Sequence, residues 1–246
     1  FGVNVPLLYP QTDELMEIIV REKVPIVFTS AGNPKKYTSF LKKAGIKVAH
    51  VIANKKFALK AVEAGVDAVV AEGFEAGGHN GFEETTTMVI VPMIREIVDI
   101  PLIAAGGIAS GKALYAVMAL GADGVQMGSV FAASAESSAH PAFKNEILQA
   151  DDGDTYLVMK SLVPVRLIKN AFFQHIYQAE KSGADKDSLA AILGKGRAKK
   201  GMFEGNTEEG ELEIGQVAGL INQIKPVKRI MGEIIADFNT TAARQS

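Results

Sequence analysis

The sequence has no cysteine, no long apolar run and almost no excess charge. The missing cysteines exclude disulfide bonds, thiolate catalysis and cysteine-ligated metal centres. Because no apolar run reaches about 18 residues, the sequence predicts no membrane span. The net charge of −2 provides no field that would attract nucleic acid, and we interpret the short basic run at residues 195–200 as a solvated face.

The beginning of the chain lacks the marks of a targeting segment. It opens on Phe1 inside an apolar pattern, with neither a basic stretch nor a small-residue cleavage site. With the absence of cysteine, this predicts a cytoplasmic protein. The signature Gly-x-Gly-x-x-Gly does not follow an early strand, which disfavours a Rossmann arrangement.

What is present is a repeated unit of apolar strand, turn and amphipathic helix. Glycines at Gly45, Gly65 and Gly121 end predicted helices and are followed by apolar strands, which is typical of αβ turns. Such apolar strands alternating with helices predict a parallel sheet, either a closed barrel or an open doubly wound sheet. The predicted strands are residues 1–7, 24–30, 46–52, 66–72, 101–105 and 124–127, and the predicted helices are 12–22, 34–43, 55–64, 87–98 and 111–120.

The second part of the chain has helical periodicity over residues 162–182, 186–193 and 215–238, and its pattern contains no further pair of clear strands. Glycine-rich turns after the last three predicted strands favour a barrel, whose active face gathers strand C-termini. The predicted fold is a TIM (β/α)8 barrel. Six βα units are too few for eight strands, so either the first two units are absent from this chain or the sheet is open. Residues 1–150 would form strands three to eight, and residues 151–246 a mainly helical lid with the last barrel helix.

Two glycine turns carry the first chemical signal. Gly106-Gly107 ends a strand before a helix that starts near Ser110, and Gly128-Ser129 ends the next strand. Backbone N–H groups at such turns cradle phosphate, and barrels commonly build a phosphate site from their last two βα loops. The alternative, tight packing alone, explains a single glycine pair but not both turns in this order.

The second signal is the stretch of residues 71–81, in which four glycines surround His79 at the end of a predicted strand. An imidazole there can exchange a proton near neutral pH or donate a hydrogen bond to a developing oxyanion. The alternative is an ordinary flexible loop. We predict that Glu72 and Glu75 anchor this loop, and that three other histidines are structural or solvent-facing: His50, His140 and His175.

Asn4 stands among apolar residues of the first predicted strand. A buried, unpaired amide is costly, so we expect Asn4 to bond a ligand or a neighbouring loop. No histidine has the spacing of a metal ligand, and the prediction is that no metal is bound.

These motifs together resemble the FMN-dependent barrels that include nitronate monooxygenases, once called 2-nitropropane dioxygenases, and flavin-containing enoyl-acyl-carrier-protein reductases of the FabK type. The resemblance covers nearly the whole chain. It rests on residues 1–4, 31–34, 75–81, 85–88, 103–108, 124–128, 136–141, 165–170 and 215–220.

The resemblance implies that FMN is the cofactor and that His79 faces its reactive side. The implied FMN contacts are Asn4, Ala31, Gly77, Gly78, Ala105, Gly106, Gly107, Gly128 and Ser129. It also implies one of two reactions: NAD(P)H-dependent reduction of an enoyl thioester on acyl carrier protein in fatty-acid synthesis, or oxidation of a small nitronate by O2. The likeness at residues 165–170 and 215–220 favours the reductase. We predict neither nucleic-acid nor membrane partners, and a homodimer is one option for the assembly. A non-redox phosphate-binding barrel is the alternative of another class.

Overall fold

The computed structural model describes residues 1–245, so the last residue of the predicted segment 151–246 lies outside it. The chain divides into two compact units. The first unit comprises Phe1–Glu72, Thr87–Ala105 and Val117–Gln126, and the second comprises Gly73–Thr86, Gly106–Ala116 and the residues from Met127 onward. Among residues 1–245, no helix combines the length and apolar character needed to cross a bilayer.

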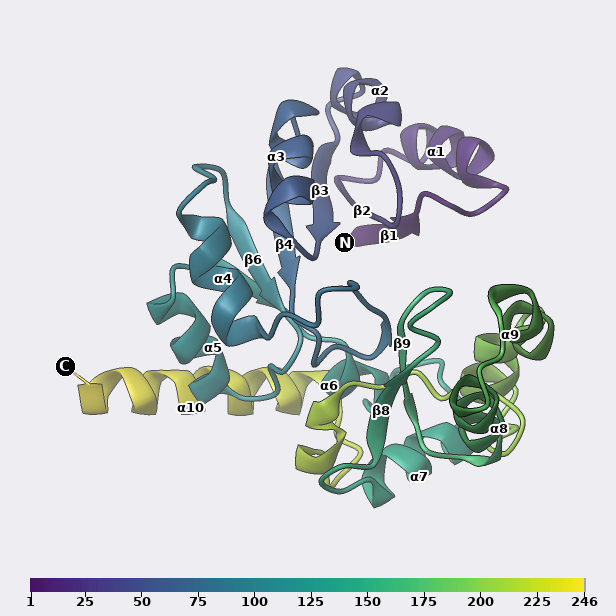
Figure 1. The fold of residues 1–246 in the computed structure, drawn as a ribbon. Coiled ribbons are helices and arrows are strands. Elements are labelled where there is room, and N and C mark those ends of the chain that lie inside the picture. The colour runs from purple at the N-terminus through teal and green to yellow at the C-terminus, as the bar shows by residue number, and fades with distance from the viewer. Residues whose placement is uncertain (246) are drawn as a thin grey trace. The chain divides into compact units, whose positions relative to one another are not determined.

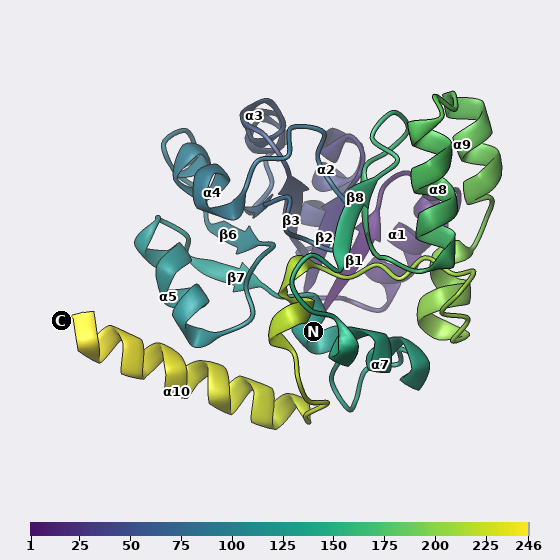
Figure 2. The ribbon, with the colours of Figure 1, turned by 60° about the horizontal axis from the view of Figure 1, so that its bottom comes forward.

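The first unit is built on a parallel sheet of six strands (Figures 1 and 2). Its order, β1-β2-β3-β4-β6-β7, follows the chain, so each strand lies beside the next one in sequence. This is the singly wound order of a βα barrel, and the prediction of such a fold is confirmed. The strands are β1 (Gly2–Pro6), β2 (Ile26–Ser30), β3 (Lys47–Ile52), β4 (Ala68–Glu72), β6 (Leu102–Ala105) and β7 (Gly124–Gln126).

Both faces of this sheet are apolar, as a parallel sheet requires. One face is fully buried at Val27, Val48, Val69 and Leu102. Helices α2, α3 and α4 lie on the outer side of the arc of strands in Figure 2 and contact β3, β4 and β6. The opposite face carries a small cluster around Val70.

Most helices of the first unit start where the sequence predicts, and one of these starts, that of α3, has a side-chain N-cap. Asn54 accepts a hydrogen bond from the backbone N–H of Phe57 at 2.9 Å and so caps α3. Residues 34–43 differ from the prediction: a 3-10 turn at Pro34–Lys36 precedes the helix Thr38–Lys43. The helices are α1 (Thr12–Arg21), α2 (Thr38–Lys43), α3 (Lys55–Glu63), α4 (Thr87–Arg95) and α5 (Gly111–Ala119), the last of which begins in the second unit.

The second unit contains a three-stranded antiparallel sheet in the order β5-β9-β8. Its strands are β5 (Gly78–His79), β8 (Thr155–Val158) and β9 (Val165–Ile168). Its helices are α6 (Ser129–Ala132), α7 (Pro141–Gln149), α8 (Ala171–Lys181), α9 (Lys186–Leu193) and α10 (Val227–Gln245), with a π-helical turn at Lys199–Phe203 and a 3-10 turn at Gln216–Leu220.

Two predicted helices differ from the observed ones. The helix predicted over residues 162–182 begins only at Ala171, because Val165–Ile168 forms the central strand β9 and is buried at every position. The N-cap is Asn170, whose side chain accepts from the N–H of Phe173 at 2.9 Å. The helix predicted over 215–238 is interrupted, since Pro226 directly precedes α10 and cannot continue a helix from the preceding turn.

Candidate active site

The loop Gly73–Thr86, which carries His79, is held at both ends by hydrogen bonds within the second unit. The N–H of Phe74 donates to the carbonyl of Thr85 at 2.9 Å. The carbonyl of Phe74 accepts from Arg166 on β9, from Nε at 3.1 Å and Nη2 at 2.9 Å. The guanidinium also lies 4.8 Å from the centre of the Phe74 ring. Because Arg166 is buried and points its fork at one carbonyl, the entry to the loop has a defined backbone position.

Asn80 holds the centre of the same loop. Its side-chain Nδ2 donates to the carbonyls of Ala76 at 2.9 Å and Gly78 at 3.0 Å. Its backbone N–H donates to the carbonyl of Pro164 at 2.9 Å. The glycine-rich stretch is therefore an ordered loop braced from inside, and not merely a flexible connection.

His79 lies on the two-residue strand β5 and pairs with Val165 of β9. Its side chain is 61% exposed, whereas the neighbouring carboxylate of Glu213 is only 20% exposed and lies 3.9 Å from Nδ1. The imidazole is thus presented to solvent from an edge strand whose backbone pairs with β9. An exposed imidazole on an ordered edge can meet a substrate without rearrangement of the loop.

Packing against the backbone requires glycine at position 77, and a positive φ favours it at position 78. A Cβ on Gly77 would lie 2.3 Å from the carbonyl carbon of Ile214. A Cβ on Gly78 would lie 2.8 Å from Oε2 of Glu213, and its φ is +76°. Their predicted contact with FMN remains a proposal.

The turn at Gly106-Gly107 has the geometry of a phosphate cradle. Both residues have positive φ, +88° and +69°. A Cβ on Gly106 would lie 2.6 Å from the carbonyl oxygen of Gly73, so no side chain fits there. Helix α5 follows, and the hydroxyl of Ser110 accepts from the N–H of Ala113 at 3.1 Å, which confirms the predicted helix start. A backbone turn without side chains, leading into a helix N-terminus, fits an anionic group.

The second turn, at Gly128-Ser129, has open space in front of its backbone. A Cβ on Gly128 would meet no atom within 4 Å. The hydroxyl of buried Ser129 accepts from the N–H of Gly215 at 3.0 Å, which leaves its proton for another acceptor. The strands that lead into the two turns, β6 and β7, are neighbours with Ala105 opposite Gln126. The residues of both turns therefore fit the phosphate of a flavin nucleotide.

Three predicted FMN contacts belong to the first unit. Asn4 is exposed on β1 and lies opposite Phe28 of β2. The prediction that Asn4 makes a hydrogen bond assumed a buried side chain, and the side chain is not buried. Ala31 is exposed directly after β2, with a φ of +49°. Ala105 is buried at the end of β6, and its carbonyl accepts from the hydroxyl of Thr87 at 3.3 Å.

The other histidines have local structural roles or face solvent. His50 is buried on β3 with Nδ1 2.7 Å from the hydroxyl of Thr29, and burial lowers its pKa to about 4. His140 caps α7 by accepting from the N–H of Ala142 at 3.1 Å. His175 is exposed on α8. Among the residues that the structure describes, no three histidine or carboxylate side chains are grouped to hold a metal ion.

Some carboxylates have a raised pKa, which the sequence alone does not show. Burial raises the pKa of Glu72, at the end of β4, to about 7. Burial also raises the pKa of Glu211 to about 7; the charge of Glu213 adds to this effect, while Arg197 opposes it. Glu213 lies two residues before the stretch 215–220 that carries the resemblance. Its proximity to His79 could not be predicted from the sequence.

Glu211→Gln is expected to stabilise the protein at pH 8 and to change its stability little at pH 4. The folded-state pKa is raised from 4.5 to about 7, so the favourable contribution of the protonated acid is present below pH 4.5 and is lost as the pH rises through 7. At pH 8 the gain should be about 2 kcal/mol. Urea unfolding at both pH values measures it, with exposed Glu204→Gln as the control. An equal effect at both pH values would contradict the prediction.

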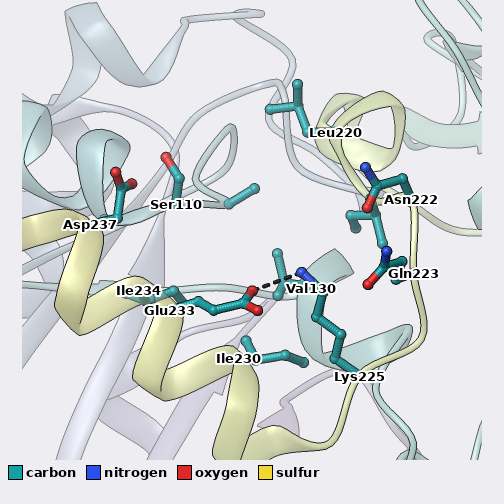
Figure 3. A pocket seen from close by; sticks show the side chains of 13 residues that line it. Ser110, Val130, Leu220, Asn222, Gln223, Lys225, Ile230, Glu233, Ile234 and Asp237 are labelled. Atoms are coloured by element: carbon teal, nitrogen blue, oxygen red, sulfur yellow. Dashed lines mark hydrogen bonds and ion pairs between the residues drawn. The ribbon is translucent and has the colours of Figure 1, made fainter.

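A cavity of about 270 Å³ lies beside α10 in the second unit (Figure 3). Its charged groups are already paired: Lys225 Nζ lies 2.7 Å from Glu233, and Asp237 accepts from the N–H of Lys112 at 2.8 Å. His79 and the glycines of the two turns do not line it. We therefore do not place the chemistry in this cavity.

The parallel sheet, with each strand beside the next, defines the class as that of the βα-barrel enzymes. The model of the nitronate monooxygenase family matches residues 2–237. The chain belongs to this family of FMN-dependent oxidoreductases.

Individual relatives differ in their reactions. The chain is 42% identical to FabK from Thermotoga maritima, with a TM-score of 0.94, over 100% of this chain and 78% of that one. It is 34% identical to a probable nitronate monooxygenase of Staphylococcus saprophyticus, over 91% of this chain and 67% of the relative. It is 31% identical to an octahydroindene-carboxyl-CoA dehydrogenase of Rhodococcus jostii, over 96% of this chain and 77% of the relative.

Proposed function

We propose that the protein is an NAD(P)H-dependent enoyl-acyl-carrier-protein reductase that uses FMN to reduce the enoyl thioester double bond in fatty-acid synthesis. The observation that carries the proposal is the 42% identity to FabK over the whole chain, with a TM-score of 0.94. The identity to the probable nitronate monooxygenase is lower, at 34% over 91% of the chain. The carboxyl-CoA dehydrogenase relative also has a thioester in the name of its substrate.

The proposed phosphate contacts lie in the second unit. The backbone of Gly106, Gly107 and Gly128 and the hydroxyl of Ser129 would hold the phosphate, with Gly77 and Gly78 as further contacts. The flavin contacts expected of Asn4, Ala31 and Ala105 in the first unit stay predictions from the sequence. FMN, when bound, supplies the transfer of a hydride that it has received from NAD(P)H.

His79 acts on the substrate in this proposal. Its exposed ring, as an imidazolium with a proton on each nitrogen, donates a hydrogen bond from Nε2 to the thioester carbonyl and so stabilises the negative charge that develops on that oxygen. The ordered loop around Asn80 and Arg166 keeps the imidazole in place, so that little entropy is lost when the substrate binds. We propose that the mainly helical segment from residue 151 excludes water as a lid.

Nitronate oxidation with O2 is the second candidate, and the family model favours it. In that reaction His79 would remove the proton α to a nitro group or orient the nitronate. A phosphate-binding barrel without redox chemistry is the third candidate. Purified protein that is yellow and has flavin absorbance would eliminate it.

Anaerobic stopped-flow spectroscopy distinguishes the first two candidates. NADPH or NADH is expected to bleach the flavin absorbance, and crotonyl thioester to restore it without oxygen. If crotonyl thioester leaves the bleached protein unchanged while a nitronate consumes oxygen, the reductase proposal is wrong. The same traces identify the preferred pyridine nucleotide.

The proposed partner is acyl carrier protein, which presents the thioester, and the proposed location is the cytoplasm, where fatty-acid synthesis would take place. A homodimer is a further proposal, and sedimentation of the purified protein tests it.

A further inference from the structure

The strand β9 brings two distant residues together along one of its edges. Its residues Val165 and Arg166 pair with β5, which carries His79. Further along, Leu167 forms an antiparallel bridge with Glu213, and the N–H of Ile168 donates to the carbonyl of Leu212 at 3.0 Å. Since β8 occupies the other edge of β9, β5 and residues 212–213 follow one another along the same edge. This topology places a carboxylate next to the imidazole.

Gly78 provides the space in which the carboxylate lies. Its Cβ position is 2.8 Å from Oε2 of Glu213, which is closer than real Cβ contacts allow. Its φ of +76° is also one that other residues rarely adopt. The contact with Glu213 therefore explains the glycine before His79, because any side chain at position 78 would displace the carboxylate.

The side chain of Glu213 is much less exposed than that of His79. The Glu213 side chain is 20% exposed and the His79 side chain 61%, and Oε1 lies 3.9 Å from Nδ1. This distance is too long for a direct hydrogen bond but within the range of an ion pair. Catalytic hydrogen bonds are often long without substrate and shorten in the complex. The carboxylate meets the Nδ1 side of the ring, and Nε2 is then the nitrogen left for a substrate.

We propose that Glu213 is the positioning residue of His79: its carboxylate accepts a hydrogen bond from Nδ1–H, which orients the ring and presents Nε2 outward. This inference rests on the proposed function in taking His79 as the group that meets the substrate. Burial raises the pKa of Glu213, and the charge of His79 opposes that shift, so the two groups are electrostatically linked. A residue that fixes the tautomer of a catalytic imidazole acts through it and not on the substrate.

The first test reads the His79 tautomer directly and needs neither substrate nor turnover. Nitrogen-15 NMR of the FMN-loaded protein at pH 8 resolves the ring nitrogens of its four histidines, and His79→Ala identifies the signals of His79. We expect the Nδ1–H tautomer to predominate. It should be lost in Glu213→Leu and partly retained in Glu213→Gln, whose amide oxygen can still accept a hydrogen bond from Nδ1–H. Exposed Glu204→Gln should leave the signals unchanged.

The second test separates positioning from a structural role. Glu213→Leu should lower kcat at least about 10-fold with KM changed less than about 3-fold, and Glu213→Gln should be intermediate. Because Glu213 acts through His79, Glu213→Leu should slow the His79→Ala protein by no more than about 2-fold.

The outcomes of the two tests are distinct. An unchanged His79 tautomer in Glu213→Leu, or fully additive losses with His79→Ala, would overturn the inference. Should Glu213→Leu not fold, the signals of Glu213→Gln decide, since wild-type signals there would also overturn it. If the wild-type protein does not reduce crotonyl thioester, the proposed function fails, while the NMR result still judges the contact between Glu213 and His79.

Discussion

His79→Ala is expected to keep its FMN and to lose turnover by a factor of about 10²–10⁴, the range that removal of a positioned acid or base produces. The side chain is 61% exposed and its backbone pairs with Val165 of β9, so truncation removes the imidazole without emptying a core position. The flavin content and kcat of the purified variant measure the two effects separately.

His175→Ala is the matched control, because it also removes an imidazole from an exposed position of the second unit. It should retain full activity. If His79→Ala loses FMN as well as turnover, His79 is a binding or structural residue and its catalytic role is wrong. A rapid flavin bleach by NADPH in His79→Ala, followed by slow reoxidation by crotonyl thioester, would assign the loss to the substrate half-reaction.

Gly128→Ala is expected to weaken FMN binding about 10- to 100-fold, equivalent to about 1.4–2.8 kcal/mol. The backbone at this position has φ −93° and ψ −68°, which alanine adopts without strain, and a Cβ would meet no protein atom within 4 Å. The added methyl group can therefore be felt only by a ligand that approaches the backbone closely. Titration of the FMN-free protein with FMN, followed by fluorescence, gives the dissociation constant.

The stability of the FMN-free Gly128→Ala protein should equal that of the wild type within about 0.5 kcal/mol. Gly232→Ala is the control, since this exposed glycine inside α10 also has no neighbour within 4 Å of its Cβ position. It should bind FMN as the wild type does and be slightly more stable, because alanine favours a helix. Wild-type FMN affinity in Gly128→Ala would show that the phosphate does not lie at this turn.

The parallel sheet could be predicted because its signals are local. Apolar strands buried on both faces alternate with helices that begin at caps such as Asn54 and end at glycines such as Gly45, which has a φ of +78°. These signals require only neighbours in the chain, so the element order followed from periodicity and turn residues. The glycine turn at Gly106-Gly107 was visible for the same reason.

The antiparallel sheet of the second unit could not be predicted in this way. Residues 165–168 read equally well as part of a helix, and they become a strand because β8 and β5 pair with them from both sides. Such pairing depends on residues far away in the chain. Local propensity is overridden where tertiary hydrogen bonds and burial on both faces favour the strand.

The sequence by itself determined the βα repeat, the glycine turns and the presence of one histidine among glycines, because each of these depends on residues within a few positions of one another. Only the tertiary structure decided what surrounds His79. Arg166 holds the loop that carries it, Gly78 leaves room beside it, and Glu213 fills that room from another part of the chain. The physical reason is that the edge of β9 brings these residues together. The spacing of residues in the sequence does not show which segments pair along the same strand edge.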